Sequence, residues 1–226
     1  MGVTYRVTVE PTTEPVTLAD MQDYIRVDAG DDDTQITSLI SNARKYCEEV
    51  TGRAFATQTI VCQYIIDKPA GGLLSGPIND TQESLYHYEQ QLGANPFGVS
   101  QFYFDLPLAA PLQSITSVGT QLTKFAINGD GTPNYTPLLA LAGDGITVNW
   151  SIDTLREPGR IYFQAPLIVY SWQFVYVAGH NSSYVLPYSL KQALKEVIAY
   201  WYDHREGDAL PEGIMSKLLA KRIDWM

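Results

Sequence analysis

The chain has 226 residues, of which 45% are hydrophobic and 18% charged, so it is long and apolar enough to build the core of one ordinary domain or two small ones. This composition excludes an intrinsically disordered, collagen-like or low-complexity chain. Twenty-five acidic residues against fifteen basic ones give a formal net charge of −10, which disfavours general binding to the negative backbone of nucleic acids.

The N-terminal residues contain no apolar segment of the kind that a secretory signal has, and no apolar run approaches the roughly 18 residues of a membrane span. The two cysteines, Cys47 and Cys62, are too few for a disulfide framework, and each lies within an apolar pattern that predicts a buried thiol. We therefore expect a protein that is made in a reducing cytoplasm and does not associate with membranes.

Two helices are predicted in the first 55 residues. The first follows Thr17, which suits an N-cap because Asp20 stands three residues later, and its apolar residues recur at three- and four-residue steps. The second begins at the aspartate run 31–33, keeps one apolar face over about four turns and ends at Gly52.

The aspartate run is interpreted as a helix-capping segment. A calcium loop of the EF-hand type needs Gly and Glu at its sixth and twelfth positions, where this chain has Ile36 and Asn42. Near the other end of this helix, Arg44, Lys45 and Arg53 are expected to interact favourably with the negative end of the helix dipole.

The middle of the chain has the amino-acid composition that is typical of β-strands. Strands are predicted at seven segments rich in β-branched and aromatic residues: 57–67, 101–106, 114–118, 125–127, 145–150, 160–163 and 168–177. Residues 68–101 contain a long excursion with little periodicity, and loops of that length are usually functional or mobile.

Helical periodicity returns near the C-terminus. One helix is predicted over 187–205, beginning near Pro187 and stopped by Gly207, and a last one over 213–225. We predict an α+β fold in which residues 1–55 and 184–226 form one helical part and residues 56–183 form an inserted, antiparallel β-rich part.

No motif for catalysis, metal binding or cofactor binding is present. The three histidines, His87, His180 and His204, lie far apart and outside any zinc-binding pattern, and the chain has no nucleophile elbow, phosphate loop or dinucleotide fingerprint. We therefore expect no catalytic residue, no metal and no cofactor.

Aromatic residues make up 12% of the chain, including fifteen tyrosines. Several fall in or beside predicted loops, among them Tyr86, Tyr88, Phe97 and Tyr103. Two interpretations stay open: a tyrosine-rich core, or exposed rings at protein interfaces, which favour Tyr and Trp. A carbohydrate- or peptide-binding β module with a helical clasp would use the same residues and is an alternative function, with a hydrolase as a more distant one.

Four segments occur in a fixed order along the chain. These are VTLADMQDYIRVD (16–28), ITSLISNARKYCEEVTGRAFATQTI (36–60), LPLAAPLQSITSV (106–118), and FVYVAGH with VLPYSLKQALKEVIAYWYDHRE (174–206). The ordered set resembles the head–tail connector proteins of tailed bacteriophages, which are also called adaptor or head completion proteins. The excursion 68–101 and the stretch 119–154 depart from the compact members of that family.

The resemblance implies a structural protein of the virion neck that is not an enzyme and is made in the cytoplasm of a host bacterium. Such proteins form a ring, usually of about twelve subunits, with heterologous contacts. The ring docks beneath the portal, extends the DNA channel and joins the capsid to a stopper or tail protein during assembly and DNA ejection. The expected partners are copies of the chain, the portal and the downstream stopper or tail-completion protein, while DNA passes without specific binding.

Two sets of contact residues follow as hypotheses. The last predicted helix presents an apolar stripe for docking into a portal groove, formed by Met215, Leu218, Leu219, Ile223 and Trp225. The alternative for this stripe is internal packing against the protein's own helices. The second set, at subunit contacts, comprises Tyr86, Tyr88, Phe97 and Tyr103.

Overall fold

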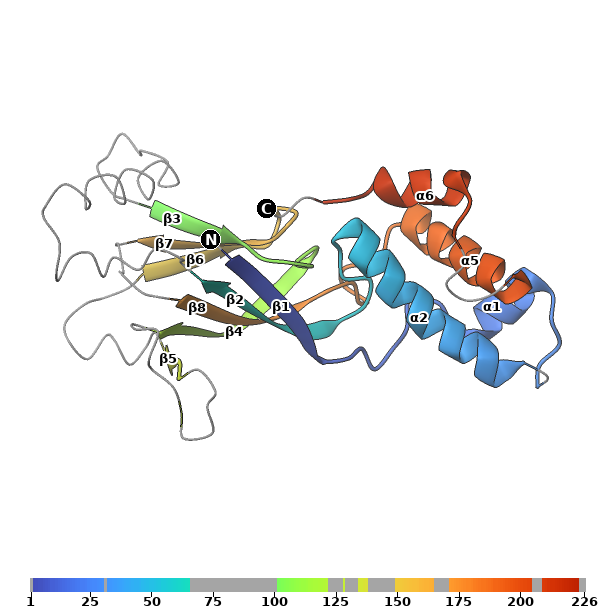
Figure 1. The fold of residues 1–226 in the computed structure, drawn as a ribbon, viewed down its shortest axis with the longest axis horizontal. Coiled ribbons are helices and arrows are strands. Elements are labelled where there is room, and N and C mark those ends of the chain that lie inside the picture. The colour runs from blue at the N-terminus through green and yellow to red at the C-terminus, as the bar shows by residue number, and fades with distance from the viewer. Residues whose placement is uncertain are drawn as a thin grey trace, which may run out of the picture.

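The computed structural model describes residues 2–30, 32–65, 101–121, 128, 134–137, 149–164, 171–204 and 209–223. Its helices are α1 (Leu18–Ile25), α2 (Asp33–Thr51), α5 (Tyr188–Asp203) and α6 (Glu212–Leu219). Its strands are β1 (Gly2–Val9), β2 (Gln58–Ile65), β3 (Gln101–Asp105), β4 (Leu112–Gln121), β5 (Thr136–Pro137), β6 (Asn149–Asp153), β7 (Arg160–Gln164) and β8 (Ser171–Ala178). The helices gather at one end of an elongated molecule and the strands at the other (Figure 1). The predicted α+β class, with helices from both ends of the chain and an antiparallel β region inserted between them, is confirmed.

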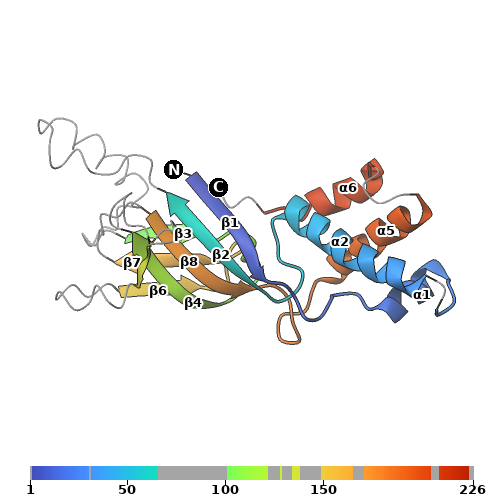
Figure 2. The ribbon, with the colours of Figure 1, turned by 60° about the horizontal axis from the view of Figure 1, so that its bottom comes forward.

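The helical part consists of α1, α2, α5 and α6, so it joins segments from both ends of the chain (Figure 2). Helix α2 contacts the other three helices, and α1 also contacts α5. The predicted apolar faces of α2 and α5 meet in one core. Its buried members are Val16, Met21, Ile36, Leu39, Ile40, Ala43, Cys47, Phe55, Leu186, Leu190, Ala193, Leu194, Val197, Ile198, Trp201 and Leu218. Each large apolar side chain that is fully buried there stabilises the fold by about 1.5–3 kcal/mol.

The two predicted helix-end signals at Thr17 and Gly52 are confirmed. Thr17 Oγ1 accepts a hydrogen bond from the backbone N–H of Asp20, while the Asp20 carboxylate accepts one from the N–H of Thr17, which completes a capping box. Gly52 has φ +69° and ends α2, in the left-handed conformation that glycine adopts without strain.

The aspartate run acts differently from the prediction. Asp32 is the N-cap residue of α2 but makes no side-chain capping bond; its carboxylate accepts a hydrogen bond from Tyr202 Oη of α5 at 2.6 Å. Asp33 Oδ1 accepts from the backbone N–H of Gly30 at 3.1 Å and from Gln22 Nε2 at 2.6 Å. Asp32 therefore ties α2 to α5, and Asp33 ties it to α1 and to Gly30, while Asp31 lies outside the described residues.

Arg44 lies near the C-terminal end of α2, as predicted, but its guanidinium is buried among carboxylates at the junction between the helical and β parts. Its guanidinium contacts three carboxylates, Glu14 and Glu48 at 2.9 Å and Glu10 at 3.0 Å, and its side chain is 2% exposed. Glu48 also accepts a hydrogen bond from the backbone N–H of Phe55 at 2.7 Å. We call Arg44, Glu10, Glu14 and Glu48 the Arg44 cluster.

The last helix is shorter than predicted. It ends with Leu219, and the backbone then turns so that the N–H of Ile223 donates to the carbonyl oxygen of Thr51 at 2.8 Å. This bond joins the chain after α6 to the C-terminal end of α2, which a continued helix to residue 225 would not allow.

The β part contains two antiparallel sheets. One has the strand order β1-β2-β8-β4-β5 and the other the order β3-β7-β6. The predicted strands 57–67, 101–106, 160–163 and 168–177 correspond to β2, β3, β7 and β8.

Of the other predicted strands, 114–118 lies inside the longer β4, 145–150 overlaps β6 at its end, and 125–127 lies outside the described residues. The predicted excursion 68–101 also lies outside them, apart from residue 101, the first of β3.

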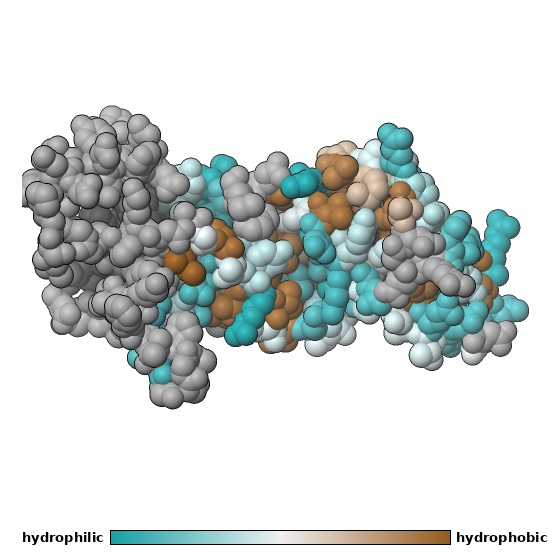
Figure 3. Space-filling view, in the orientation of Figure 1, coloured by the Kyte–Doolittle hydropathy of each residue, from teal (hydrophilic) through white to brown (hydrophobic). Residues whose placement is uncertain are grey.

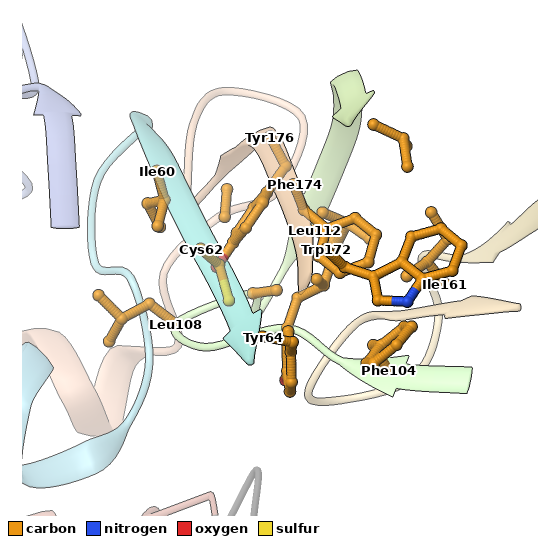
Figure 4. Close-up of a cluster of buried hydrophobic side chains, with 14 of the residues drawn as sticks. Ile60, Cys62, Tyr64, Phe104, Leu108, Leu112, Ile161, Trp172, Phe174 and Tyr176 are labelled. Carbon is orange, nitrogen blue, oxygen red and sulfur yellow. The ribbon is translucent and has the colours of Figure 1, made fainter. Parts of the chain in front are cut away.

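The two sheets bury an aromatic core between them (Figure 4). Phe104 of β3 and Phe163 of β7 contact Trp172 and Phe174 of β8, with ring centroids 4.7–6.1 Å apart. Aromatic pairs of this kind contribute about 0.5–1.5 kcal/mol beyond the burial of their area. Since the rings come from both sheets, neither sheet forms this core alone.

The prediction that residues 1–55 belong to the helical part is wrong for residues 2–9, which form strand β1. Residues 2–9 pair antiparallel with β2, and Val3 and Val7 pack against the β core while Arg6 is exposed. Apolar and polar residues alternate along the sequence of β1, as in a half-buried strand. The first residues of the chain therefore belong to the β sheet and not to the helices.

Candidate interaction surfaces

The five residues predicted to dock onto a portal differ in exposure. Leu218 is fully buried in the helical core, Met215 and Ile223 are half-buried, and Leu219 is 47% exposed. Trp225 lies outside the described residues. Some of the stripe therefore packs internally, and one leucine of α6 stays at the surface.

Helix α6 is fixed in place by polar contacts along its length. Lys217 Nζ lies 2.7 Å from both carboxylate oxygens of Glu196 on α5, and Arg53 Nε donates to the carbonyl oxygen of Lys221 at 2.7 Å. Hydrophobic atoms gather at the surface around α6 in the space-filling view (Figure 3). These contacts join α6 to α5 and the residues after α6 to the end of α2.

Tyr103 is the described member of the residues predicted at subunit contacts, because Tyr86, Tyr88 and Phe97 lie outside the described residues. It lies on β3 opposite Tyr162 of β7, on the face of the three-stranded sheet that points away from the core, and is 43% exposed. Of the two interpretations left open by the sequence, the exposed ring is the one found at Tyr103, and its role at a subunit contact stays a prediction.

The Tyr103 ring is immobilised by its neighbours. The guanidinium carbon of Arg160 lies 3.6 Å from the ring centroid, and Arg160 binds Asp105 through two hydrogen bonds of 2.6 and 2.7 Å. Hydrogen bonds from this side chain to Asp105 raise the pKa of Arg160, so the cation is permanent. An exposed Tyr whose ring packs against a buried, hydrogen-bonded Arg loses little entropy when a partner binds. We call Tyr103, Arg160, Asp105 and Tyr162 the Tyr103 plate.

A second group of exposed apolar residues follows β8. Val185 is 75% exposed, Tyr188 80% and Tyr184 40%, all close to the first turn of α5. The sequence places the two tyrosines in or beside predicted loops, where an exposed ring is one of the two open interpretations. No sequence signal predicts the exposure of Val185, which precedes a buried leucine. We call these three residues the α5 rim.

A third exposed group lies on the edge strand β6 and the turn that follows it. Trp150 is 42% exposed, Ile152 38% and Leu155 93%. Trp150 and Ile152 pair with Phe163 and Ile161 of β7, so they lie on the core-facing side of the sheet, at its edge. Alternation predicts burial for them, and only the position of β6 at the sheet edge leaves them exposed.

A groove of about 430 Å³ lies where the helical and β parts meet. Its walls are residues 12–15, residues 55–57, some of the loop after β8 and Lys191 of α5. Val185 of the α5 rim is among the lining residues. We call this feature the junction groove.

His180 lines the junction groove with one ring nitrogen satisfied. Nδ1 lies 3.0 Å from the carbonyl oxygen of Tyr184, and because a carbonyl only accepts, this nitrogen carries the hydrogen. Nε2 is buried and has no hydrogen-bond partner among the described residues. Burial of the ring is the main cause that lowers the pKa of His180.

The lowered pKa of His180 predicts a stability that depends on pH. The unfolded chain binds the proton first, so folding stability should fall as the pH drops below about 6.5, by well under about 1.4 kcal/mol per unit because the ring is partly exposed. We expect His180→Asn, which keeps the donor to Tyr184, to lose less stability than the parent chain between pH 7 and pH 5. Urea titrations at both pH values measure this, and equal losses in the two proteins would contradict it.

Reactive cysteines, metal-binding clusters and membrane-spanning helices are three other features that would indicate a function. Cys47 and Cys62 are buried and free, as predicted, and burial raises the pKa of Cys47 to about 12, so its thiol is neutral and inert at physiological pH. No group of three or more His, Cys, Asp or Glu side chains is placed to hold a metal ion among the described residues. Within the same residues, no helix is both long and apolar enough to cross a bilayer.

The chain matches no known family by its sequence and no curated protein, but its fold matches solved structures. It superimposes with a TM-score of 0.54 and 18% identity on a chain in the neck of an empty gene transfer agent (GTA) particle computed with C6 symmetry, covering 98% of this chain and 95% of that one. A chain in the neck of the native GTA particle computed with C12 symmetry gives a TM-score of 0.53, 18% identity and the same coverages.

A chain in the virion of the native GTA particle gives a TM-score of 0.52 at 16% identity, with 97% of this chain and 95% of that one covered. At such identities the likeness establishes a shared fold over nearly the full length of both chains, including the helical and the β part.

Proposed function

We propose that this chain is a structural subunit of the neck of a tailed phage or phage-like particle, where it acts as a head–tail connector and not as an enzyme. One observation carries the proposal: the fold matches chains from GTA necks and a GTA virion over nearly the whole length of both partners. A match that includes both the helices and the sheets is more specific than a match of one common sheet or helix pair.

The proposed assembly is a homo-oligomeric ring, with twelve subunits as the first expectation. The C12 symmetry of one matching neck and the C6 symmetry of the other support a cyclic arrangement. Cyclic rings use heterologous contacts, so each subunit needs two different surfaces. The Tyr103 plate and the α5 rim are two such surfaces at different places in the chain.

The proposed ring docks beneath a portal, extends the DNA channel and joins the capsid to a stopper or tail-completion protein. The formal charge of −10 supports a channel wall that DNA passes without specific binding, because like charges repel. In the portal-docking hypothesis, Leu219 is the exposed residue among the described members of the stripe, while Met215 and Leu218 anchor α6 in the helical core.

Native mass spectrometry of the pure protein, alone and mixed with its cognate portal, tests the proposal. A discrete ring, or one copy of the chain added for each portal subunit, is the expected result. A protein that stays monomeric and does not bind the portal would overturn the proposal, and affinity for glycans on an array would then support the alternative of a carbohydrate-binding module.

Substitutions at two adjacent leucines of α6 distinguish an effect on portal binding from an effect on stability. We expect Leu219→Glu to abolish portal binding in the same experiment while changing the free energy of unfolding by less than about 0.5 kcal/mol, because the side chain is half exposed. Leu218→Ala should instead lower stability by about 2–5 kcal/mol, since it leaves a cavity in the helical core. Portal binding that survives Leu219→Glu would exclude α6 as the docking helix.

A further inference from the structure

Residues 10–17 connect β1 to α1 and form one wall of the junction groove. Two of them, Pro11 and Pro15, have no backbone N–H to donate. No backbone-to-backbone hydrogen bond joins residues 10–16 to any other described residue. We call residues 10–17 the strap.

Side chains hold the strap in place. Two of its carboxylates, Glu10 and Glu14, bind the buried guanidinium of Arg44 at 3.0 and 2.9 Å, and Glu10 also binds Lys45 at 3.0 Å. Near its end, Val16 is fully buried in the helical core. The strap is therefore attached mainly by ionic contacts to one face of α2 and by one apolar anchor.

The Arg44 guanidinium also reaches the opposite wall of the junction groove. It binds Glu48 at 2.9 Å, and Glu48 accepts the backbone N–H of Phe55, a residue that lines the groove. One side chain thus connects the strap to the segment that leads into β2. The distance between these two walls depends on the Arg44 cluster remaining intact.

We propose that the strap opens as a local unit, independently of global unfolding, and that the Arg44 cluster keeps it closed over the junction groove. Segments without backbone hydrogen bonds have the lowest local opening free energies in a protein. Glu10 and Glu14 are 54% and 28% exposed, so salt screens their attraction to Arg44. Opening removes residues 12–15 from one wall and widens the groove.

Native-state proteolysis with thermolysin tests the proposal on the full chain. The protease cleaves before large apolar residues, and an open strap offers it the bonds before Val16 and Leu18. We expect Glu10→Gln combined with Glu14→Gln to accelerate cleavage at these bonds about tenfold, because all three ion pairs of the strap are lost while the buried Arg44–Glu48 pair is kept. Lys45→Gln is the matched control, since it removes only an exposed contact of Glu10.

Two further measurements decide the outcome. Urea unfolding of each variant gives the global stability, and cleavage that rises only in proportion to global unfolding would overturn the proposal. Raising NaCl from about 50 to about 500 mM should accelerate strap cleavage of the parent chain, corrected with an unstructured peptide, but not that of the double variant. Cleavage of the double variant at the parental rate would equally overturn it.

Discussion

Replacing Arg44 by methionine should lower the free energy of unfolding by about 3–5 kcal/mol, the usual cost of removing one partner from a buried ion pair. Glu48 is 4% exposed, and Arg44 is the cation that contacts it in the described structure. Methionine matches the stem of arginine in shape but supplies no charge. The variant would therefore bury an uncompensated carboxylate at the base of the junction.

Equilibrium urea denaturation measures this loss, with Lys45→Met as the control. Lys45 follows Arg44 and binds one of the same carboxylates, but it is 55% exposed, so its replacement should change stability by less than about 1 kcal/mol. Adding Glu48→Gln to Arg44→Met should recover much of the loss, because the amide oxygen still accepts the N–H of Phe55. A loss below about 1 kcal/mol for Arg44→Met would contradict the assignment of Arg44 as the central charge of the junction.

The stability of the Arg44→Met variant should also depend on pH, in a direction that follows from the pKa of Glu48. Burial is the largest cause acting on Glu48 and raises its pKa, although Arg44 opposes it. A group whose pKa is raised on folding contributes stability at low pH that is lost as the pH rises through the folded value. Since Arg44→Met lacks the opposing cation, its loss of unfolding free energy relative to the parent chain should be larger at about pH 8 than at about pH 5.

Features that depend on short stretches of the chain could be predicted from the sequence. The period of Ile36, Leu39 and Ile40 on α2 identified a buried helix face, and the spacing of Thr17 and Asp20 identified a capping box. These signals are local because the helix brings residues three and four apart onto one face.

Features that depend on distant segments could not be predicted in the same way. Arg44 binds Glu10 and Glu14, which precede it by 34 and 30 residues in the sequence. The residues near Arg44 on α2 do not show whether its guanidinium is buried among carboxylates or exposed near the helix C-terminus. The exposure of Trp150 likewise depends on β6 ending the sheet, since the alternation along β6 alone predicts burial.

The candidate surfaces show the same division. Tyr103 could be selected from the sequence as an exposed aromatic residue, but its immobilisation by Arg160 depends on the pairing of β3 with β7. The apolar stripe of α6 could be recognised by its period, whereas its division into buried Leu218 and exposed Leu219 depends on how α6 lies against α2 and α5. A period locates an apolar face, and tertiary contacts decide how much of it remains for a partner.

Gly179→Ala should lower the free energy of unfolding by at least about 3 kcal/mol, because strain and overlap add at this position. Gly179 has φ +112°, which a residue with a side chain rarely adopts, and an added Cβ would overlap the backbone carbonyl of Ala56. Its N–H donates to the carbonyl oxygen of Pro111, and its carbonyl accepts from Gln113, so the backbone is held on both sides. Relief of the overlap requires the end of β8 to move away from the segment leading into β2.

Gly213→Ala is the control for this glycine substitution, and its expected effect has the opposite sign. Gly213 lies in α6 with nothing within 4 Å of an added Cβ, so alanine should stabilise the helix by about 0.5–1 kcal/mol. Thermal and urea unfolding of both variants measure the difference. A Gly179→Ala protein as stable as the parent would show that the end of β8 moves away from the segment leading into β2 at low cost. A large loss would show that the close backbone contact between Gly179 and Ala56 fixes the end of β8 against the segment leading into β2.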